Sequence, residues 1–202
     1  MTGRRLGFWS SAVLVGIGLA YVIVLAVGFA RHGFREPIAD PVLAIMEALT
    51  LLSAPALVTL MAAIHDRATN ERKVYGLVAL AFATLCAGTT SVVHFVELTA
   101  VRQVGGGGIV WPSRTYAAEL LAWDVFLGLA FVFAAPVFAG GEAERTVRRA
   151  LLACGVLCLV GTVGPLVGDM RLQLAGVLGY AGVLPVLSFL LARLFARDRA
   201  PS

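Results

Sequence analysis

The sequence has few charged residues for its length. Only 14% of its 202 residues are Asp, Glu, Lys or Arg, whereas soluble proteins carry about a quarter. Hydrophobic residues make up 59%, and the mean hydropathy is +0.90. This balance excludes an ordinary soluble domain and indicates a membrane protein. The net charge of +4 lies in short clusters between apolar runs, without a recognition helix or zinc-finger spacing, so we expect no nucleic-acid partner.

Cysteine and histidine are also scarce. The three cysteines, Cys86, Cys154 and Cys158, lie inside apolar segments, which excludes a disulfide framework and predicts small core residues. Of the three histidines, His65 lies near the inner side of the membrane and His94 near the outer side, so they cannot share a haem. The chain shows no internal repeat between its halves.

Six apolar segments are long enough to cross a membrane, which takes about 20 residues. They lie at about 9–30, 41–64, 74–98, 116–138, 150–168 and 173–193. Each is apolar on every side, as lipid requires. The sequence therefore predicts an all-α, polytopic transmembrane helix bundle of six helices, forming a single integral membrane domain over residues 1–202.

Lysine and arginine are distributed unevenly between the two sides of this bundle. With the N-terminus inside, eleven fall on the inner side and five on the outer side. The inner residues are Arg4, Arg5, Arg67, Arg72, Lys73, Arg145, Arg148, Arg149, Arg193, Arg197 and Arg199. The outer residues are Arg31, Arg35, Arg102, Arg114 and Arg171. The positive-inside rule then predicts cytoplasmic termini in a bacterial inner membrane.

The first span resembles a signal peptide in two respects: it follows "MTGRR" and ends near the small residues of "GFA". Its apolar run is longer than the roughly 7–15 residues of a signal core, so we expect an uncleaved helix. If it were cleaved, five spans would remain, with the new N-terminus outside.

Acidic residues inside the spans gather toward the outer side, with Asp124 the deepest at about 12 Å. A charge at mid-membrane costs about 2.5–3.5 kcal/mol, and such residues mark functional sites by default. We therefore predict a ligand pocket in the outer half of the bundle. Its candidate residues are Glu47, Ser91, His94, Glu97, Glu119 and Asp124.

Within this set, His94 and Glu97 in "SVVHFVEL" are three residues apart and share a helix face. We expect them to form a hydrogen-bonded pair, either functional or a clasp between helices. For Asp124 we expect a function or a pairing with Arg114, His94 or a tyrosine. Glu119 begins a span, where a carboxylate complements the helix dipole.

Three smaller features predict local structure. Asp169 follows Gly168 and is expected to cap a turn, and Ser113 is a candidate N-cap for the fourth span. Gly176, Gly179 and Gly182 recur every three residues and predict close helix packing. The four glycines of "RQVGGGGIVWPSR" predict a loose loop above the polar residues, either a lid or a spacer.

Metal chemistry is one alternative for the polar residues. A carboxylate-bridged centre needs carboxylates and histidines from several helices, but His-x-x-Glu occurs once here and reverses the usual order. A zinc hydrolase of the ceramidase type would use Ser91, His94 and Asp124, yet the last span lacks the required histidine pair. The sequence leaves metal and cofactor open.

Two resemblances bear on the fold. "LTLLSAPALVTLMAAIH", "ERKVYGLVALAF", "SVVHFVELT" and "FAAPVF" resemble a family of small bacterial polytopic membrane proteins, from the second span to the sixth. That resemblance implies the fold and implies no activity. "HFVE" followed by "YAAELLAW" is faintly similar to the emopamil-binding-protein superfamily, although the His–Glu spacing and the number of spans differ.

The leading expectation for function is a binding protein, sensor or carrier for a small amphiphile or cation, embedded among membrane lipids. External pH could switch such a pocket through His94 or a carboxylate. A second expectation is a membrane enzyme with Asp124 and His94 as acid and base or as metal-site residues. A third is a structural subunit, whose polar residues join helices in a homo-oligomer or dock a partner.

Overall fold

The computed structural model describes residues 2–33, 38–105 and 109–197. Across these ranges the chain is helical and contains no strand. Six of its helices are long and apolar enough to cross a membrane. They span Gly3–Arg31, Val42–Arg67, Asn70–Val101, Arg114–Val137, Glu142–Val167 and Met170–Arg197. The predicted six-helix bundle is thus confirmed.

The spans are built from shorter elements in a fixed order. The first two are α1 (Thr2–His32) and α2 (Val42–Arg67). The third comprises η1 (Asn70–Arg72), α3 (Lys73–Val96) and η2 (Glu97–Val101). The fourth comprises α4 (Arg114–Leu120), η3 (Leu121–Phe126), α5 (Leu127–Ala134) and η4 (Ala135–Val137). The fifth is α6 (Glu142–Gly161) with α7 (Val163–Val167), and the sixth is α8 (Met170–Val177), η5 (Leu178–Val183) and α9 (Leu184–Arg197).

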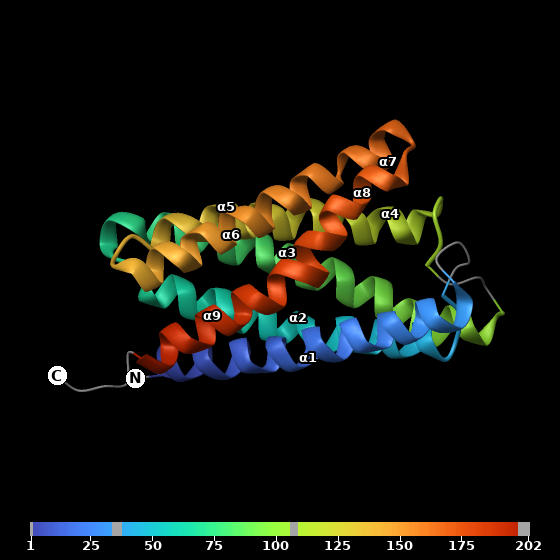
Figure 1. The fold of residues 1–202 in the computed structure, drawn as a ribbon, viewed down its shortest axis with the longest axis horizontal. Coiled ribbons are helices and arrows are strands. Elements are labelled where there is room, and N and C mark those ends of the chain that lie inside the picture. The colour runs from blue at the N-terminus through green and yellow to red at the C-terminus, as the bar shows by residue number, and fades with distance from the viewer. Residues whose placement is uncertain (1, 34–37, 106–108, 198–202) are drawn as a thin grey trace.

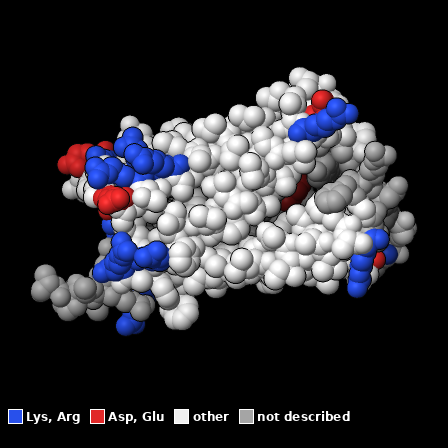
Figure 2. Space-filling model, in the orientation of Figure 1, with Lys and Arg blue, Asp and Glu red and all other residues white. Residues whose placement is uncertain are grey.

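The bundle has two ends, which we call the terminal end and the distal end. The start of α1 and the end of α9 lie at the terminal end, together with the α2–α3 and α5–α6 connections (Figure 1). The α1–α2, α3–α4 and α7–α8 connections lie at the distal end, on the right of Figure 1. Basic side chains gather at the terminal end in Figure 2. The fifth span starts at Glu142 rather than near 150, because the charged stretch 142–149 continues the helix beyond its apolar part.

Close helix contacts depend on glycine. Gly155 of α6 lies against α5, where an added Cβ would come within 2.8 Å of the Gly128 carbonyl oxygen. Gly161 of α6 lies against α8, where a Cβ would come within 2.7 Å of the Gly176 Cα. An added Cβ at Gly179 would meet Cys158, 2.9 Å away, whereas Gly182 faces Leu178 of its own helix. The predicted packing role is thus confirmed for Gly176 and Gly179 and not for Gly182.

The helix ends that the sequence predicts are present. The Ser113 hydroxyl accepts the Tyr116 backbone N–H at 3.1 Å and caps α4. Asp169 caps α8 by accepting the Arg171 N–H at 3.0 Å. Gly168 has a φ of 75°, the left-handed conformation that glycine adopts without a steric penalty, and so ends α7. The middle of the glycine-rich loop, 106–108, lies outside the described residues.

Within the part of the chain that the structure describes, three stretches are π-helical: η2, η3 and η5. A π turn is wider than an α turn and is frequently found at functional sites. Two buried carboxylates lie on these stretches, Glu97 on η2 and Asp124 on η3. Two of the three π stretches therefore carry a buried carboxylate of the distal half.

Candidate functional site

Among the described residues, the buried carboxylates all lie in the distal half of the bundle. They are Glu47, Glu97, Glu119 and Asp124. Each was predicted as a ligand-pocket residue, and each is more than nine-tenths buried or very nearly so. The structure divides them among three groups of contacts, which we call the His94 cluster, the Arg102 cluster and the Asp124 position.

The His94 cluster joins α3 to the fourth span. His94 Nε2 lies 2.8 Å from Glu119 Oε1, and it donates this hydrogen bond because a carboxylate only accepts. The Thr90 hydroxyl lies one turn earlier on α3 and donates to the same carboxylate, at 2.8 Å and 3.0 Å from its two oxygens. Trp123 Nε1 donates to Thr90 Oγ1 at 3.1 Å. The four side chains form one buried, connected network.

The carboxylate that His94 contacts is therefore Glu119 rather than Glu97. The sequence predicted a helix-dipole role for Glu119, but its carboxylate bonds side chains of the neighbouring span. Glu97 Oε2 and His94 Nδ1 have no hydrogen-bond partner among the described residues. Ser91 is half-buried and takes no part in these hydrogen bonds.

The Arg102 cluster ties the end of the third span to the second. Arg102 lies just after η2, and its guanidinium donates to Glu47 Oε2 at 2.7 Å and to the Glu97 carbonyl oxygen at 2.8 Å. It also donates hydrogen bonds to both carboxylate oxygens of Asp40, with N···O distances of 2.8 Å and 2.9 Å. This bidentate contact holds the pKa of Asp40 below its usual value and raises the pKa of Arg102.

The Glu47 carboxylate depends on this arginine because Glu47 is only 1% exposed to solvent. A carboxylate in such a place requires a cation or a proton. The sequence placed Arg102 among the outer loop charges and so missed its role. A signal was nonetheless present: Glu47 lies near the distal end of its span, and Arg102 follows the distal end of the neighbouring span.

The Asp124 position is different, because this side chain is fully buried and has no ion-pair partner. Neither carboxyl oxygen makes a well-formed hydrogen bond with a described residue, although the Gln173 amide lies close to the carboxyl group, so the predicted pairings with Arg114, His94 or a tyrosine do not form there. Asp124 faces the glycine contact between α6 and α8, where a Cβ on Gly161 would come within 3.1 Å of Oδ1. The glycines leave the space that the carboxyl group occupies.

Aromatic and polar groups surround Asp124 and Glu119. The Trp123 ring contacts the Tyr180 ring with centroids 5.5 Å apart, and the Tyr180 hydroxyl accepts from Gln173 Nε2 at 2.9 Å. Three tyrosines from different spans are within electrostatic range of these carboxylates: Tyr21, Tyr116 and Tyr180. Sequence reasoning did not single out Trp123, Tyr21 or Tyr180, because aromatic residues in a membrane span are ordinary.

The surface is hollowed beside this region. Figure 2 shows a hollow toward the distal end, between α1 on one side and α4 and α8 on the other, with acidic atoms set back inside it. Of the buried carboxylates, Glu119 keeps the largest exposed fraction, at 9%. The combination of acidic atoms in this hollow and aromatic rings beside the buried carboxylates suits a cationic amphiphile, since aromatic faces and carboxylates both attract cations.

A metal centre finds no support in this geometry. Within the described ranges, no group of three or more His, Cys, Asp or Glu side chains converges as metal ligands would. His65 lies near the terminal end of α2, far along the chain from the His94 cluster. The three cysteines are buried and free, as the sequence predicted for core residues.

Comparisons with models of protein families, with curated proteins and with solved structures give no match to this chain. The two resemblances drawn from the sequence stay predictions.

Proposed function

We propose that this multi-pass membrane protein binds a small amphiphilic cation in the distal half of its bundle, as a binding protein, sensor or carrier. The observation that carries the proposal is Asp124, a fully buried carboxyl group that forms no ion pair and no well-formed hydrogen bond within the described residues, with only the neutral Gln173 amide close to it. A buried carboxylate of this kind lowers the stability of the fold unless a ligand binds it or a proton neutralises it. The carboxylates of Glu47 and Glu119, by contrast, accept hydrogen bonds from Arg102 and His94.

The chemistry around Asp124 favours an ammonium group on the ligand. A protonated amine brings N–H donors that a carboxylate accepts, and Trp123 and Tyr180 offer aromatic faces beside it. The hollow of Figure 2 opens between helices, so the ligand's apolar part would lie toward lipid. Gln173 and Glu119 would supply further polar contacts.

A membrane-embedded enzyme is the second candidate, and one observation favours it. His94 is oriented by Glu119 through Nε2, while its Nδ1 has no partner among the described residues. An imidazole held in this way can act as a general base. In this candidate Asp124 would act as an acid on the same ligand.

The test of the leading proposal is a comparison of wild type with Asp124→Asn in lipid nanodiscs. We expect wild type to bind n-octylammonium at least tenfold more tightly than Asp124→Asn, with n-octanol bound equally weakly by both. Isothermal titration calorimetry measures both affinities. Asp169→Asn removes the same charge from a capping residue at the distal end and should bind like wild type.

The thermal unfolding midpoint distinguishes a ligand site from a structural role. Because Asp124 forms no ion pair that the substitution would break, we expect Asp124→Asn to be as stable as wild type or more so. A variant that bound n-octylammonium normally but unfolded at a lower temperature would contradict the proposal and support the structural-subunit alternative.

We also propose that the terminal end faces the cytoplasm of a bacterial inner membrane, since it carries most of the basic residues. Two single-cysteine variants test this orientation: Val104→Cys at the distal end, where the side chain is 82% exposed, and Arg148→Cys at the terminal end. In spheroplasts, a membrane-impermeant maleimide should label the first and spare the second until lysis. The reverse pattern would invert the topology. The native cysteines are buried and give the background.

A further inference from the structure

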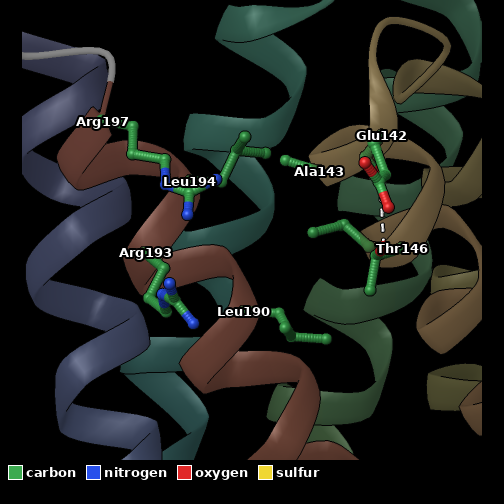
Figure 3. A pocket seen from close by; sticks show the side chains of 8 residues that line it. Glu142, Ala143, Thr146, Leu190, Arg193, Leu194 and Arg197 are labelled. Carbon is green, nitrogen blue, oxygen red and sulfur yellow. Dashed lines mark hydrogen bonds between the residues drawn. The ribbon is translucent and has the colours of Figure 1, made fainter.

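A second cavity lies at the terminal end of the bundle, far from the carboxylates of the distal half. It has a volume of about 360 Å³ and lies between α6 and α9. Figure 3 shows Arg193 and Arg197 extending from α9 toward the gap, with Glu142 and Thr146 of α6 across from them.

The cavity exists because α6 and α9 pack against different neighbouring helices. Toward the terminal end α9 packs on α1, where Gly7 leaves room for the Phe195 ring and an added Cβ would come within 2.6 Å of it. Meanwhile α6 packs on α5 through Gly155 and Gly128. The two helices therefore diverge toward the terminal end, as Figure 1 shows, and the gap between them is partly unfilled.

The charges at this cavity are predominantly positive. Arg193 and Arg197 form no ion pair with any described residue, and Arg193 lies 5.7 Å from the Phe189 ring centroid. The nearby Glu144 is already engaged, since it accepts a 2.6 Å hydrogen bond from Arg67. Among the described residues, Glu142 is the one acidic side chain that lines the cavity. Two guanidinium groups one turn apart match the oxygens of a phosphate.

The rest of the lining is apolar and continues toward the membrane interior. Val147, Leu190 and Leu194 form part of the wall. Val186, one turn before Leu190 on α9, is 57% exposed and extends this apolar surface toward the middle of the bilayer. The volume suits a small polar headgroup and is too small for two acyl chains as well, which would then lie along α9.

We propose that this cavity binds the phosphate of an anionic phospholipid headgroup, held by Arg193 and Arg197, with the acyl chains against the exposed face of α9. Basic pockets between transmembrane helices on the cytoplasmic side are a recognised means of binding anionic lipids. The site is independent of the cation-binding proposal, because it uses different residues at the opposite end of the bundle.

Native mass spectrometry of the full chain in neutral detergent tests the proposal. Wild type is titrated with phosphatidylglycerol and, separately, with phosphatidylcholine of the same acyl chains. We expect at least tenfold tighter binding of the first phosphatidylglycerol molecule, and loss of that preference in the Arg193→Gln, Arg197→Gln double variant. Arg148→Gln, Arg149→Gln removes the same charge from exposed positions on α6 outside the cavity and should retain the preference.

A second variant tests the cavity rather than its charge. Thr146 is exposed on α6 and lines the gap, so Thr146→Phe should fill it without disturbing the core and should also abolish the preference. Equal effects of the two arginine pairs would overturn the proposal, since they would reveal only general attraction to a basic surface. So would inorganic phosphate at millimolar concentration displacing phosphatidylglycerol completely, because the ligand would then be a soluble anion.

Discussion

Replacing Arg102 by glutamine is expected to lower the free energy of unfolding by roughly 3 kcal/mol, the lower end of the range for breaking a buried ion pair. The reason is Glu47, whose carboxylate is 1% exposed and accepts its 2.7 Å hydrogen bond from this guanidinium. Without Arg102 the carboxyl group must take up a proton or remain charged in an apolar setting, and protonation limits the loss. Reversible unfolding in mixed micelles, followed by circular dichroism, measures the change.

The partner variant provides the control. Glu47→Gln leaves Arg102 with its bidentate contact to Asp40, so we expect a loss well under that of Arg102→Gln. The double variant should recover most of the stability, because no buried charge is left without a partner. Equal losses in the two single variants would mean that the Arg102 cluster does not depend on the burial of Glu47.

The second large effect is expected at the contact between α6 and α8. Gly161→Ala should lower the free energy of unfolding by about 1–3 kcal/mol, the usual cost of forcing extra volume into a packed core. Its Cβ would come within 2.7 Å of the Gly176 Cα and 2.8 Å of the Gly176 nitrogen, which are backbone atoms and cannot rotate away. The two helices must separate beside Asp124, so binding of n-octylammonium should weaken as well.

Gly88→Ala is the matched control for this variant. Gly88 lies on α3, and a Cβ there meets nothing within 4 Å. Alanine should therefore be neutral or slightly stabilising at that position, because glycine has the lower helix propensity. Similar destabilisation of Gly88→Ala and Gly161→Ala would show that the loss comes from helix propensity and not from the close contact.

The sequence alone predicts the architecture well, for physical reasons that act locally. Apolar length determines the six spans, and Ser113 and Asp169 cap helices because their side chains reach backbone N–H groups a few residues ahead. The gathering of the buried acidic residues in one half is also visible from the sequence. Each of these features depends on residues close together along the chain.

The pairing of those side chains could not be predicted in the same way. His94 and Glu97 share a helix, but the closer carboxylate comes from another span. The π turns add a second obstacle: Glu119 and Asp124, five residues apart, would lie about 140° apart around a regular α-helix. The π-helix η3 begins between them and includes Asp124, so a helical wheel misplaces Asp124. Contacts between spans depend on how each helix is rotated about its own axis relative to its neighbours, which the residue pattern does not encode.

The hollow beside the carboxylates has a thermodynamic consequence for any ligand that reaches it. It lies between α1 and α8, helices that lipid would surround, so the solvent from which the ligand departs is the bilayer rather than water. Each methylene added to an alkyl chain favours transfer into hydrocarbon by about 0.8 kcal/mol, so two methylenes raise the local concentration roughly tenfold or more. Apparent affinity measured against the aqueous concentration would therefore climb with chain length even where the protein touches only the headgroup. Among ligands that differ only in chain length, partitioning into the bilayer would determine the apparent affinity. The carboxylates would determine which headgroups the protein binds.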